Sequence, residues 1–497
     1  HCPSWGKVPF RDPETRCSSI AIVPSSDEPR PSSAGCADES RPVMTTDPAG
    51  RDPGPDDSGA PGSPGHEARS LQTRAHTLIP GGAHTYSKGD DQYPENAPPF
   101  IVRGDGSHVW DMDGREYIEY GAGLRAVTLG HAFPAVTKAA CNAMQEGLNF
   151  VRPAPIEVAC AEALLGLLPA GQMVKFAKNG SDTTTAAVKL ARAYTGRDLV
   201  AICSDQPFFS VDDWFIGTTA VSAGIPESVR RLTKTFRYND TASLEALLSE
   251  YPDQIACVVL EAARYGEPQP GFLQGVREAC SRHGAVLILD EMITGFRWDL
   301  GGAQTVYDIE PDLSTFGKGM ANGFSVSALV GKRELMELGG LYHSSDRVFL
   351  LSTTHGGETS ALAACMATID VYRREGVIDR LYEAGDRLRH GVDQAITAAG
   401  VKGHVEVVGR SCNLVFATRD PEKKPSQSFR ALFMQELIAG GVIAPSFVVN
   451  FSHSDADIDR TVDVVGAALQ VYRKALNGSV GDHLVGRPVK PVYRRRN

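Results

Sequence analysis

Five consecutive apolar residues, Ala285-Val286-Leu287-Ile288-Leu289, lead directly into two carboxylates, Asp290 and Glu291. A short, continuous apolar run is typical of a strand that is buried on both faces of a parallel sheet. The carboxyl ends of such strands form the crevice where α/β folds bind ligands. The position of Asp290 therefore predicts a functional carboxylate, and the alternative interpretation is an Asp that only caps the next turn.

Similar patterns extend along the chain on both sides of this run. β-branched and apolar runs alternate with helical stretches, which is typical of an α/β fold with a mostly parallel sheet covered on both faces. The expected strands are Met173–Phe176, Leu199–Ile202, Ile255–Leu260 and Ala285–Leu289, and two of the helical stretches are Thr184–Tyr194 and Phe272–His283.

Two further stretches carry candidate chemistry. Lys318 stands between Gly317 and Gly319, so backbone and ligand can approach it closely, although an exposed loop lysine is the simpler interpretation. Asn179, Gly180 and Ser181 lie between an expected strand and an expected helix. Free N–H groups at a helix start bind phosphate, and a plain N-cap is the alternative there. The order of these elements, a phosphate turn, a strand-end Asp and a glycine-flanked Lys, is more specific than any one of them.

At these residues the chain resembles the class III aminotransferases of pyridoxal-phosphate (PLP) fold type I, and within them the glutamate-1-semialdehyde 2,1-aminomutases and their relatives. The resemblance covers roughly residues 71–475. It is carried by the stretches Leu78–Gly82, Trp110–Gly114, Gly130–Ala132, Arg192–Arg197 and Leu289–Arg297. It implies a seven-stranded, mostly parallel large domain (121–370) and a smaller α+β domain built from residues 71–120 and 371–475.

The resemblance also implies roles for individual residues. Lys318 is expected to hold PLP as a Schiff base and then to act as the catalytic base, while Asp290 keeps the ring nitrogen protonated. Asn179, Gly180 and Ser181 are expected at the phosphate. Phe208 and Met292 are expected on the two faces of the ring. Thr354 matches a threonine that reaches the phosphate of the neighbouring subunit's cofactor, so a homodimer is expected.

The stretches that differ from the aminomutases bear on the substrate. The arginine that follows their Pro-Gly-Gly motif is missing here, with Lys88 nearest that place, and their aromatic residue before the Gly-His motif is replaced by Leu124-Arg125. Acidic residues near aromatic ones would suit a cationic amino sugar. Stretches around Arg125 and Glu358 also resemble aminoglycoside-biosynthesis transaminases. We therefore expect transfer of an amino group to or from an amino-sugar aldehyde, and an aminomutase or epimerase is the alternative. The expected substrate-binding residues are Tyr86, Lys88, Arg125, Asp213, Trp214 and Glu358.

The composition sets the remaining expectations. The formal net charge is -10, which argues against nucleic acid or an anionic membrane as the main partner. No apolar run is long enough to span a bilayer. Ten cysteines without paired spacing indicate a reduced, cytoplasmic protein, and no metal site is expected. Residues 1–70 hold 12 of the 31 prolines and are expected to be a disordered leader, while 476–497 form a basic tail.

Overall fold

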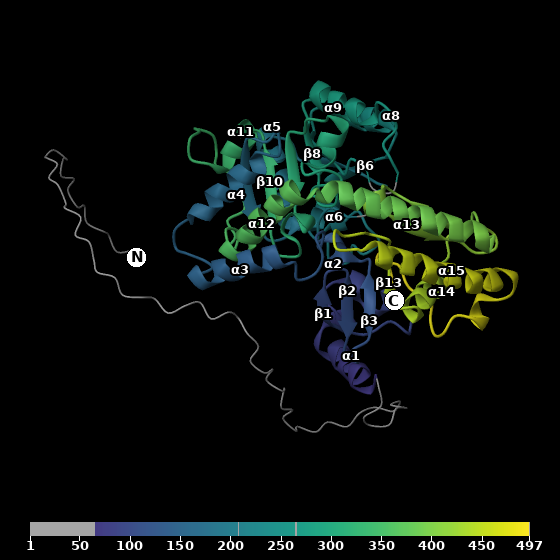
Figure 1. Cartoon of the computed structure of the whole chain (residues 1–497). Coiled ribbons are helices and arrows are strands. Elements are labelled where there is room, and N and C mark those ends of the chain that lie inside the picture. Colours follow the sequence, from purple (N-terminus) through teal and green to yellow (C-terminus); the bar gives the residue numbers. More distant parts are fainter. Residues whose placement is uncertain (1–64, 207, 264–265, 497) are drawn as a thin grey trace, which may run out of the picture. The chain divides into compact units, whose positions relative to one another are not determined.

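The computed structural model describes residues 65–206, 208–263 and 266–496 (Figure 1). Most of the expected leader, residues 1–64, lies outside these ranges. Helix α1 (His66–Leu78) begins four residues before the expected end of the leader at residue 70. Ala68 in this helix is buried, and the N–H of Gly65 donates to Asp113 at 3.1 Å, so tertiary contacts order the start of the helix.

A seven-stranded sheet forms the centre of the larger part of the molecule. Its strand order is β4-β10-β9-β8-β7-β5-β6, and only β10 runs antiparallel to its neighbours. This confirms the expected α/β fold with a mostly parallel sheet. The strands are β4 (Met173–Ala177), β5 (Leu199–Cys203), β6 (Thr233–Phe236), β7 (Ile255–Leu260), β8 (Val286–Asp290), β9 (Leu313–Phe316) and β10 (Ser327–Gly331).

Alternate residues of the central strands face different helices. Val286 and Ile288 pack in the cluster that contains α5 (Gly180–Thr195), whereas Leu287 and Leu289 pack in the cluster that contains α8 (Thr241–Glu250) and α9 (Phe272–His283). In Figure 1, α8 and α9 lie together beside β6 and β8. Because side chains alternate along a strand, Asp290 points to the same side as Val286 and Ile288, which is the side of α5.

Three carboxyl ends meet at one edge of the sheet. β8 and β9 are parallel, and β10 runs antiparallel to both β9 and β4, so β4, β8 and β9 all end at the same edge. The chain continues there into α5, into the Asp290 turn and into the turn that begins at Lys318. The topology therefore brings the three sequence candidates to one place, at the carboxyl ends of the strands, where α/β sheets bind their ligands.

The smaller sheets come from both ends of the described chain. β1 (Ile101–Asp105), β2 (His108–Asp111), β3 (Glu116–Glu119) and β13 (Val442–Ile443) form a four-stranded sheet, and β11 (Val405–Val408) pairs with β12 (Val415–Thr418). The helices α13 (Val377–Ala399), α14 (Gln427–Ala439) and α15 (Asp455–Asn477) pack around them (Figure 1). The expected domain boundary at 370 falls inside α12 (Thr359–Glu375).

The expected basic tail folds back onto the N-terminal part of the described chain. Arg494 pairs with Asp91 at 2.6 Å, Arg487 lies 3.5 Å from Asp90, and Val489 is buried. The acidic pair Asp90-Asp91 therefore faces arginines of this same chain.

The remaining helices surround these sheets. They are α2 (Ala122–Arg125), α3 (Pro134–Glu146), α4 (Pro155–Leu165), α6 (Asp213–Ile216), α7 (Glu227–Arg230), α10 (Ala303–Tyr307) and α11 (Arg333–Met336). Among the described residues, no helix combines the length and apolar character that a membrane span requires.

Candidate active site

The start of α5 forms one wall of the site. Asn179 is the N-cap residue, and its own N–H donates to Asp182 at 2.9 Å. As at every helix start, the N–H groups of the first turn, here Gly180 and Ser181, have no carbonyl partner within the helix. Together with the helix dipole they form a place where an anion is stabilised.

Met292 lies between this helix start and the lysine turn. A Cβ atom added to Gly180 would stand 2.8 Å from the Met292 sulfur, and one added to Gly317 would stand 2.7 Å from it. Because both positions are glycine, the backbone segments at Gly180 and Gly317 can approach the Met292 thioether closely. Met292 is therefore in contact with both the phosphate turn and the lysine turn.

Asp290 is the buried carboxylate at the centre of the site. Its side chain is 2 % exposed and accepts the N–H of Met292 at 2.9 Å. Burial, and after it the negative charge of Glu261, raise the pKa of Asp290 to about 7, although the positive charge of Lys318 acts in the opposite direction. A cation placed against this carboxylate would keep it ionised, so the site favours a protonated, positively charged ligand atom there.

Lys318 occupies a strained backbone position. It opens the 3₁₀ turn Lys318–Ala321 with a φ of +46°, a conformation that residues with a Cβ rarely adopt. Asn322 ends the turn, accepts the N–H of Leu129 and donates to the carbonyl of Gly130, both at 2.9 Å. Strain of this kind persists where the surroundings fix it, as they do at many functional sites.

The structure adds residues that were not predicted. Thr315 is the register partner of Asp290 on β9, so it faces the same side of the sheet, and its buried hydroxyl has no hydrogen-bond partner among the described residues. Glu261 follows β7 directly and acts electrostatically on Asp290. Its N–H donates to Gln206 at 2.8 Å. The rule that singled out Asp290, a carboxylate after a buried strand, could also have found Glu261.

The expected ring-stacking residue lies on a segment tied to α5. The N–H of Val211 donates to the hydroxyl of Ser181 at 3.0 Å, and Thr184 donates to the carbonyl of Phe209 at 2.8 Å. Phe208 remains exposed and meets Phe215 edge to face, with 5.8 Å between ring centroids. An exposed aromatic face is thus held next to the helix start.

Thr354 and Glu358 lie before α12. Thr354 is exposed in the single chain. Glu358 accepts the N–H of Ser360 at 2.8 Å as the N-cap of α12 and forms a half-buried ion pair with Lys178 at 2.8 Å. The Lys178 ammonium and the Ser360 bonds hold the pKa of Glu358 below its usual value, against the effect of its partial burial. The Glu358 carboxylate, which was expected to bind substrate, is therefore already paired with the ammonium group of Lys178.

The other expected substrate-binding residues differ in their exposure to solvent. Tyr86 and Lys88 are exposed on a 3₁₀ turn, with Tyr86 71 % exposed, and Asp213 is exposed at the start of α6. Trp214 differs from the expectation of a stacking surface. It is 6 % exposed, because its indole packs against Phe215 and donates its N–H to Thr185 at 2.8 Å.

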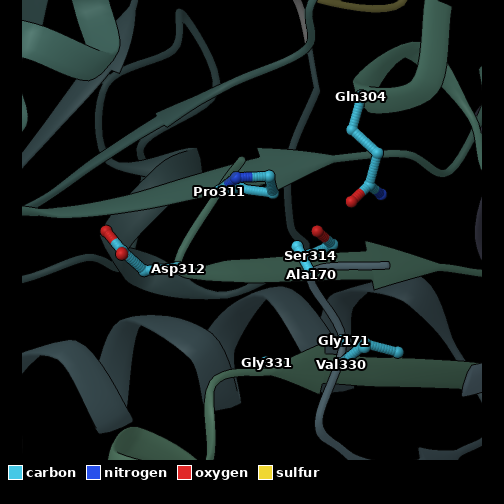
Figure 2. Close-up of a pocket in the computed structure, with 8 residues that line it drawn as sticks. All are labelled: Ala170, Gly171, Gln304, Pro311, Asp312, Ser314, Val330 and Gly331. Carbon is cyan, nitrogen blue, oxygen red and sulfur yellow. The ribbon is translucent and has the colours of Figure 1, made fainter. Parts of the chain in front are cut away.

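A small cavity lies elsewhere in the sheet, away from the predicted residues. Figure 2 shows it between β9 and β10, near the amino end of β9. Its volume is about 10 Å³, roughly the space of one water molecule. The lining residues are Ala170, Gly171, Gln304, Pro311, Asp312, Ser314, Val330 and Gly331. The cavity is too small for an organic ligand and contains none of the expected site residues.

The geometry fits a phosphorylated aromatic aldehyde. The start of α5 suits a phosphate, Asp290 suits a protonated ring nitrogen, and Lys318 has the amine that reacts with an aldehyde. Thr315 offers a buried hydroxyl beside Asp290. These are the complementary groups that PLP requires.

The comparisons with known proteins agree with this fit. The family model "Aminotransferase class-III" matches residues 91–469. A glutamate-1-semialdehyde 2,1-aminomutase of Desulforamulus reducens is 34 % identical, over 82 % of this chain and 98 % of the relative. An omega-transaminase structure from Sphaerobacter thermophilus matches with a TM-score of 0.74 and 27 % identity, over 83 % of this chain and 98 % of that one.

A second solved structure, the FumI protein of Sphingopyxis sp. MTA144, matches with a TM-score of 0.76 and 26 % identity, over 83 % of this chain and 97 % of that one. Its structure is of a PLP-bound form. The fold is therefore that of the fold type I transaminases, and the cofactor is pyridoxal phosphate. This chain is an enzyme of the class III PLP-dependent aminotransferase family.

Proposed function

We propose that this enzyme transfers an amino group to or from the aldehyde of an amino sugar, with Lys318 and Asp290 as its catalytic residues. The observation that supports the catalytic half is the meeting of Asp290, Lys318 and the α5 start at one sheet edge, with the Lys318 charge acting on Asp290. When bound, the cofactor supplies an electron sink for the substrate carbon next to the nitrogen.

Each residue of this chain has a distinct task in that proposal. Gly180 and Ser181 bind the phosphate with their N–H groups, and Asn179 fixes the start of that helix. Asp290 holds the proton at the ring nitrogen. The Lys318 Nζ atom first anchors the cofactor and afterwards moves a proton to and from the substrate carbon. Phe208 and Met292 confine the ring from two sides.

The amino-sugar part of the proposal has support in the outer residues. Asp213 offers an exposed carboxylate and Tyr86 an exposed ring, which suit an ammonium group and a sugar ring. Lys88 and Arg125 would contact the polar end of the co-substrate. In the structure Glu358 is paired with Lys178, so we assign it to positioning the Thr354 segment. We assign Trp214 a structural role, because its buried side chain anchors α6 to the protein interior.

A direct comparison of substrates tests the function. The cofactor-loaded enzyme is mixed with a 6′-amino aminoglycoside, or with the corresponding 6′-oxo compound and an amino acid. Conversion of the cofactor to its amine form by the sugar amine, seen by absorbance, is the expected result. Asp213→Asn should raise KM for the cationic sugar about tenfold with little change in kcat, because a charge-assisted contact is lost. An unchanged KM would remove Asp213 from the binding site.

The second candidate is an aminomutase of the glutamate-1-semialdehyde type. The 34 % identity to a protein of that name, over nearly its whole length, favours it. Efficient formation of 5-aminolevulinate from the semialdehyde, with no reaction on any amino sugar, would establish it in place of the transaminase.

We also propose that the enzyme acts as a cytoplasmic homodimer. Large apolar side chains are exposed around α3, α4 and the segment before Thr354, which is a surface more typical of an interface than of solvent. They include Met144, Leu148, Phe150, Val151, Val158 and Phe349. The N–H of Thr359, at the start of α12, donates to the carbonyl of Leu148 at 3.0 Å, so this surface borders the Thr354 segment. The helices α3, α4 and α12 lie together in Figure 1.

Phe349→Asp tests the dimer. The buried charge should shift the protein to a monomer with cofactor affinity at least about tenfold lower, since Thr354 could no longer reach the second site. Light scattering gives the mass, and Val485→Asp, at another exposed apolar residue, is the control. A wild-type protein that is active as a monomer would contradict the proposal.

A further inference from the structure

Thr315 lies on the face of the central sheet that carries Asp290. It is the register partner of Asp290, one strand away on β9, and neighbouring strands lie about 4.8 Å apart. Leu313, two residues earlier on β9, packs in the cluster that contains α5, and alternation places the Thr315 side chain on that same side. The side chains of Asp290 and Thr315 therefore stand next to each other on one face of the sheet.

The hydroxyl group of Thr315 is buried and makes no hydrogen bond. The residue is 0 % exposed, and its Oγ1 atom has no partner among the residues that the structure describes. The backbone at this position is satisfied, since the carbonyl of Thr315 accepts the N–H of Glu291 at 2.9 Å. An unbonded hydroxyl in the protein interior reduces stability, and most buried polar side chains therefore have partners.

Two nearby hydroxyl groups show the usual arrangement. Thr184 on α5 donates to the carbonyl of Phe209 at 2.8 Å, and Ser327 on β10 donates to the carbonyl of Asn179 at 2.8 Å. Both bonds end on backbone carbonyls, so these hydroxyl groups stabilise the fold. Thr315 makes no such bond, and a valine side chain would fill nearly the same space without the cost of a buried hydroxyl. A purely structural role therefore does not account for threonine at this position.

Asp290 can accept a further hydrogen bond. Its Oδ1 atom accepts the N–H of Met292 at 2.9 Å. An ionised carboxylate has two oxygens and about four acceptor sites, so Met292, a protonated ring nitrogen and a hydroxyl can all donate to it. Hydrogen bonds to the charged form of a carboxyl group favour that form. A hydroxyl donor beside Asp290 would therefore counteract its burial, which disfavours the ionised carboxylate.

We propose that the Thr315 hydroxyl donates to the Asp290 carboxylate when a protonated ring nitrogen is bound there, and so holds Asp290 ionised and correctly oriented. The two side chains are not hydrogen-bonded in the structure, so the bond forms by rotation of a side chain between staggered conformations. Thr315 is a positioning residue, because it acts on the cofactor through Asp290. The inference rests on the proposed role of Asp290 and adds a second residue to it.

Thr315→Val tests the inference, because it removes the donor and keeps the shape of the side chain. In a spectroscopic titration, the Kd of this variant for pyridoxal 5′-phosphate should rise about tenfold, since a charge-assisted hydrogen bond is lost. The cofactor-free variant should melt at the same temperature as wild type or higher, because an apolar group replaces an unbonded hydroxyl. A residue with only a structural role would show a lower melting temperature and an unchanged Kd.

Two further variants control for side-chain size and for the loss of any buried hydroxyl. Thr315→Ser keeps the donor, and its Kd should stay within about threefold of the wild-type value. Thr368→Val changes a buried threonine of α12, whose hydroxyl donates to the carbonyl of Ala364 at 2.8 Å, and should leave the Kd unchanged.

A double-mutant cycle with Asp290→Asn shows whether the hydroxyl acts through the carboxylate. In the Asp290→Asn background, Thr315→Val should raise the Kd by about threefold or less, because a hydrogen bond to a neutral amide is weaker than one to a carboxylate. None of these measurements depends on the substrate, so they decide the role of Thr315 even if the amino-sugar proposal fails.

The results also separate the roles of the two residues. A wild-type Kd in Thr315→Val, an equal loss in Thr315→Ser, or the same loss in both backgrounds would overturn the role of Thr315 and leave that of Asp290 intact. A wild-type Kd in Asp290→Asn would instead refute the role of Asp290 in binding the cofactor, and the inference with it.

Discussion

Lys318→Ala is expected to lower turnover by at least about 10³-fold and to abolish the absorbance band of lysine-bound cofactor. The loss combines the covalent anchor with the base that moves the proton, each a large contribution to catalysis. The backbone at Lys318 has a φ of +46°, and the surrounding structure maintains this conformation rather than the lysine side chain alone. The melting temperature of the cofactor-free variant should therefore remain close to that of wild type.

The assignment has a matched control. Lys138→Ala changes an exposed lysine on α3 and should preserve both the absorbance band and the turnover. A Lys318→Ala variant that still yields a borohydride-stable cofactor adduct would show that another lysine forms the covalent bond.

Asp290→Asn is expected to lower turnover by on the order of 10³-fold while the fold is kept. The neutral amide cannot stabilise a positive charge at the ring nitrogen, and losing one preorganised electrostatic partner has effects of about this size. The amide oxygen of this variant can still accept the N–H of Met292, which Asp290 accepts at 2.9 Å, so the turn between Asp290 and Met292 should be preserved. A variant with near-native turnover would remove Asp290 from the mechanism.

The pH dependence of stability gives Asp290 a second signature. Burial raises the pKa of Asp290 in the cofactor-free protein to about 7, above its usual value of about 4. The protonated form is therefore favoured by folding, and its contribution to stability is complete below pH about 4 and is lost as the pH rises to about 7. Cofactor-free Asp290→Asn should lose less stability than wild type over this interval, as measured by denaturant unfolding. Bound cofactor should reduce the difference, because a ring cation favours the ionised carboxylate.

Much of this site could be predicted because it depends on patterns that are local in sequence. A continuous apolar run fixed the place of Asp290 at a strand end, and the glycines beside Lys318 indicated a close approach. The same rule applied to β7 would have added Glu261. The strands β6, β9 and β10 were not among those expected, and the antiparallel direction of β10 could not be predicted, since an apolar run reads the same in both directions.

The outer residues were harder to predict because pairing over long sequence distances decides their chemistry. Glu358 meets Lys178, 180 positions away, and the acidic Asp90-Asp91 pair meets arginines of the C-terminal segment. Trp214 turned inward because Thr185 accepts its N–H. Counting acidic residues in the sequence therefore overstated the negative charge of the expected substrate pocket, because several of these carboxylates are paired with cations of the same chain. Among the expected substrate-binding residues, Asp213 is the exposed carboxylate.

The most direct measurement is mass spectrometry of the cofactor-loaded enzyme after borohydride reduction and proteolysis. The account predicts that the reduced cofactor is attached to the peptide that contains Lys318, and that prior addition of an amino-donor substrate removes this label. A label on any other lysine, or bound cofactor that borohydride never fixes to the chain, would contradict it.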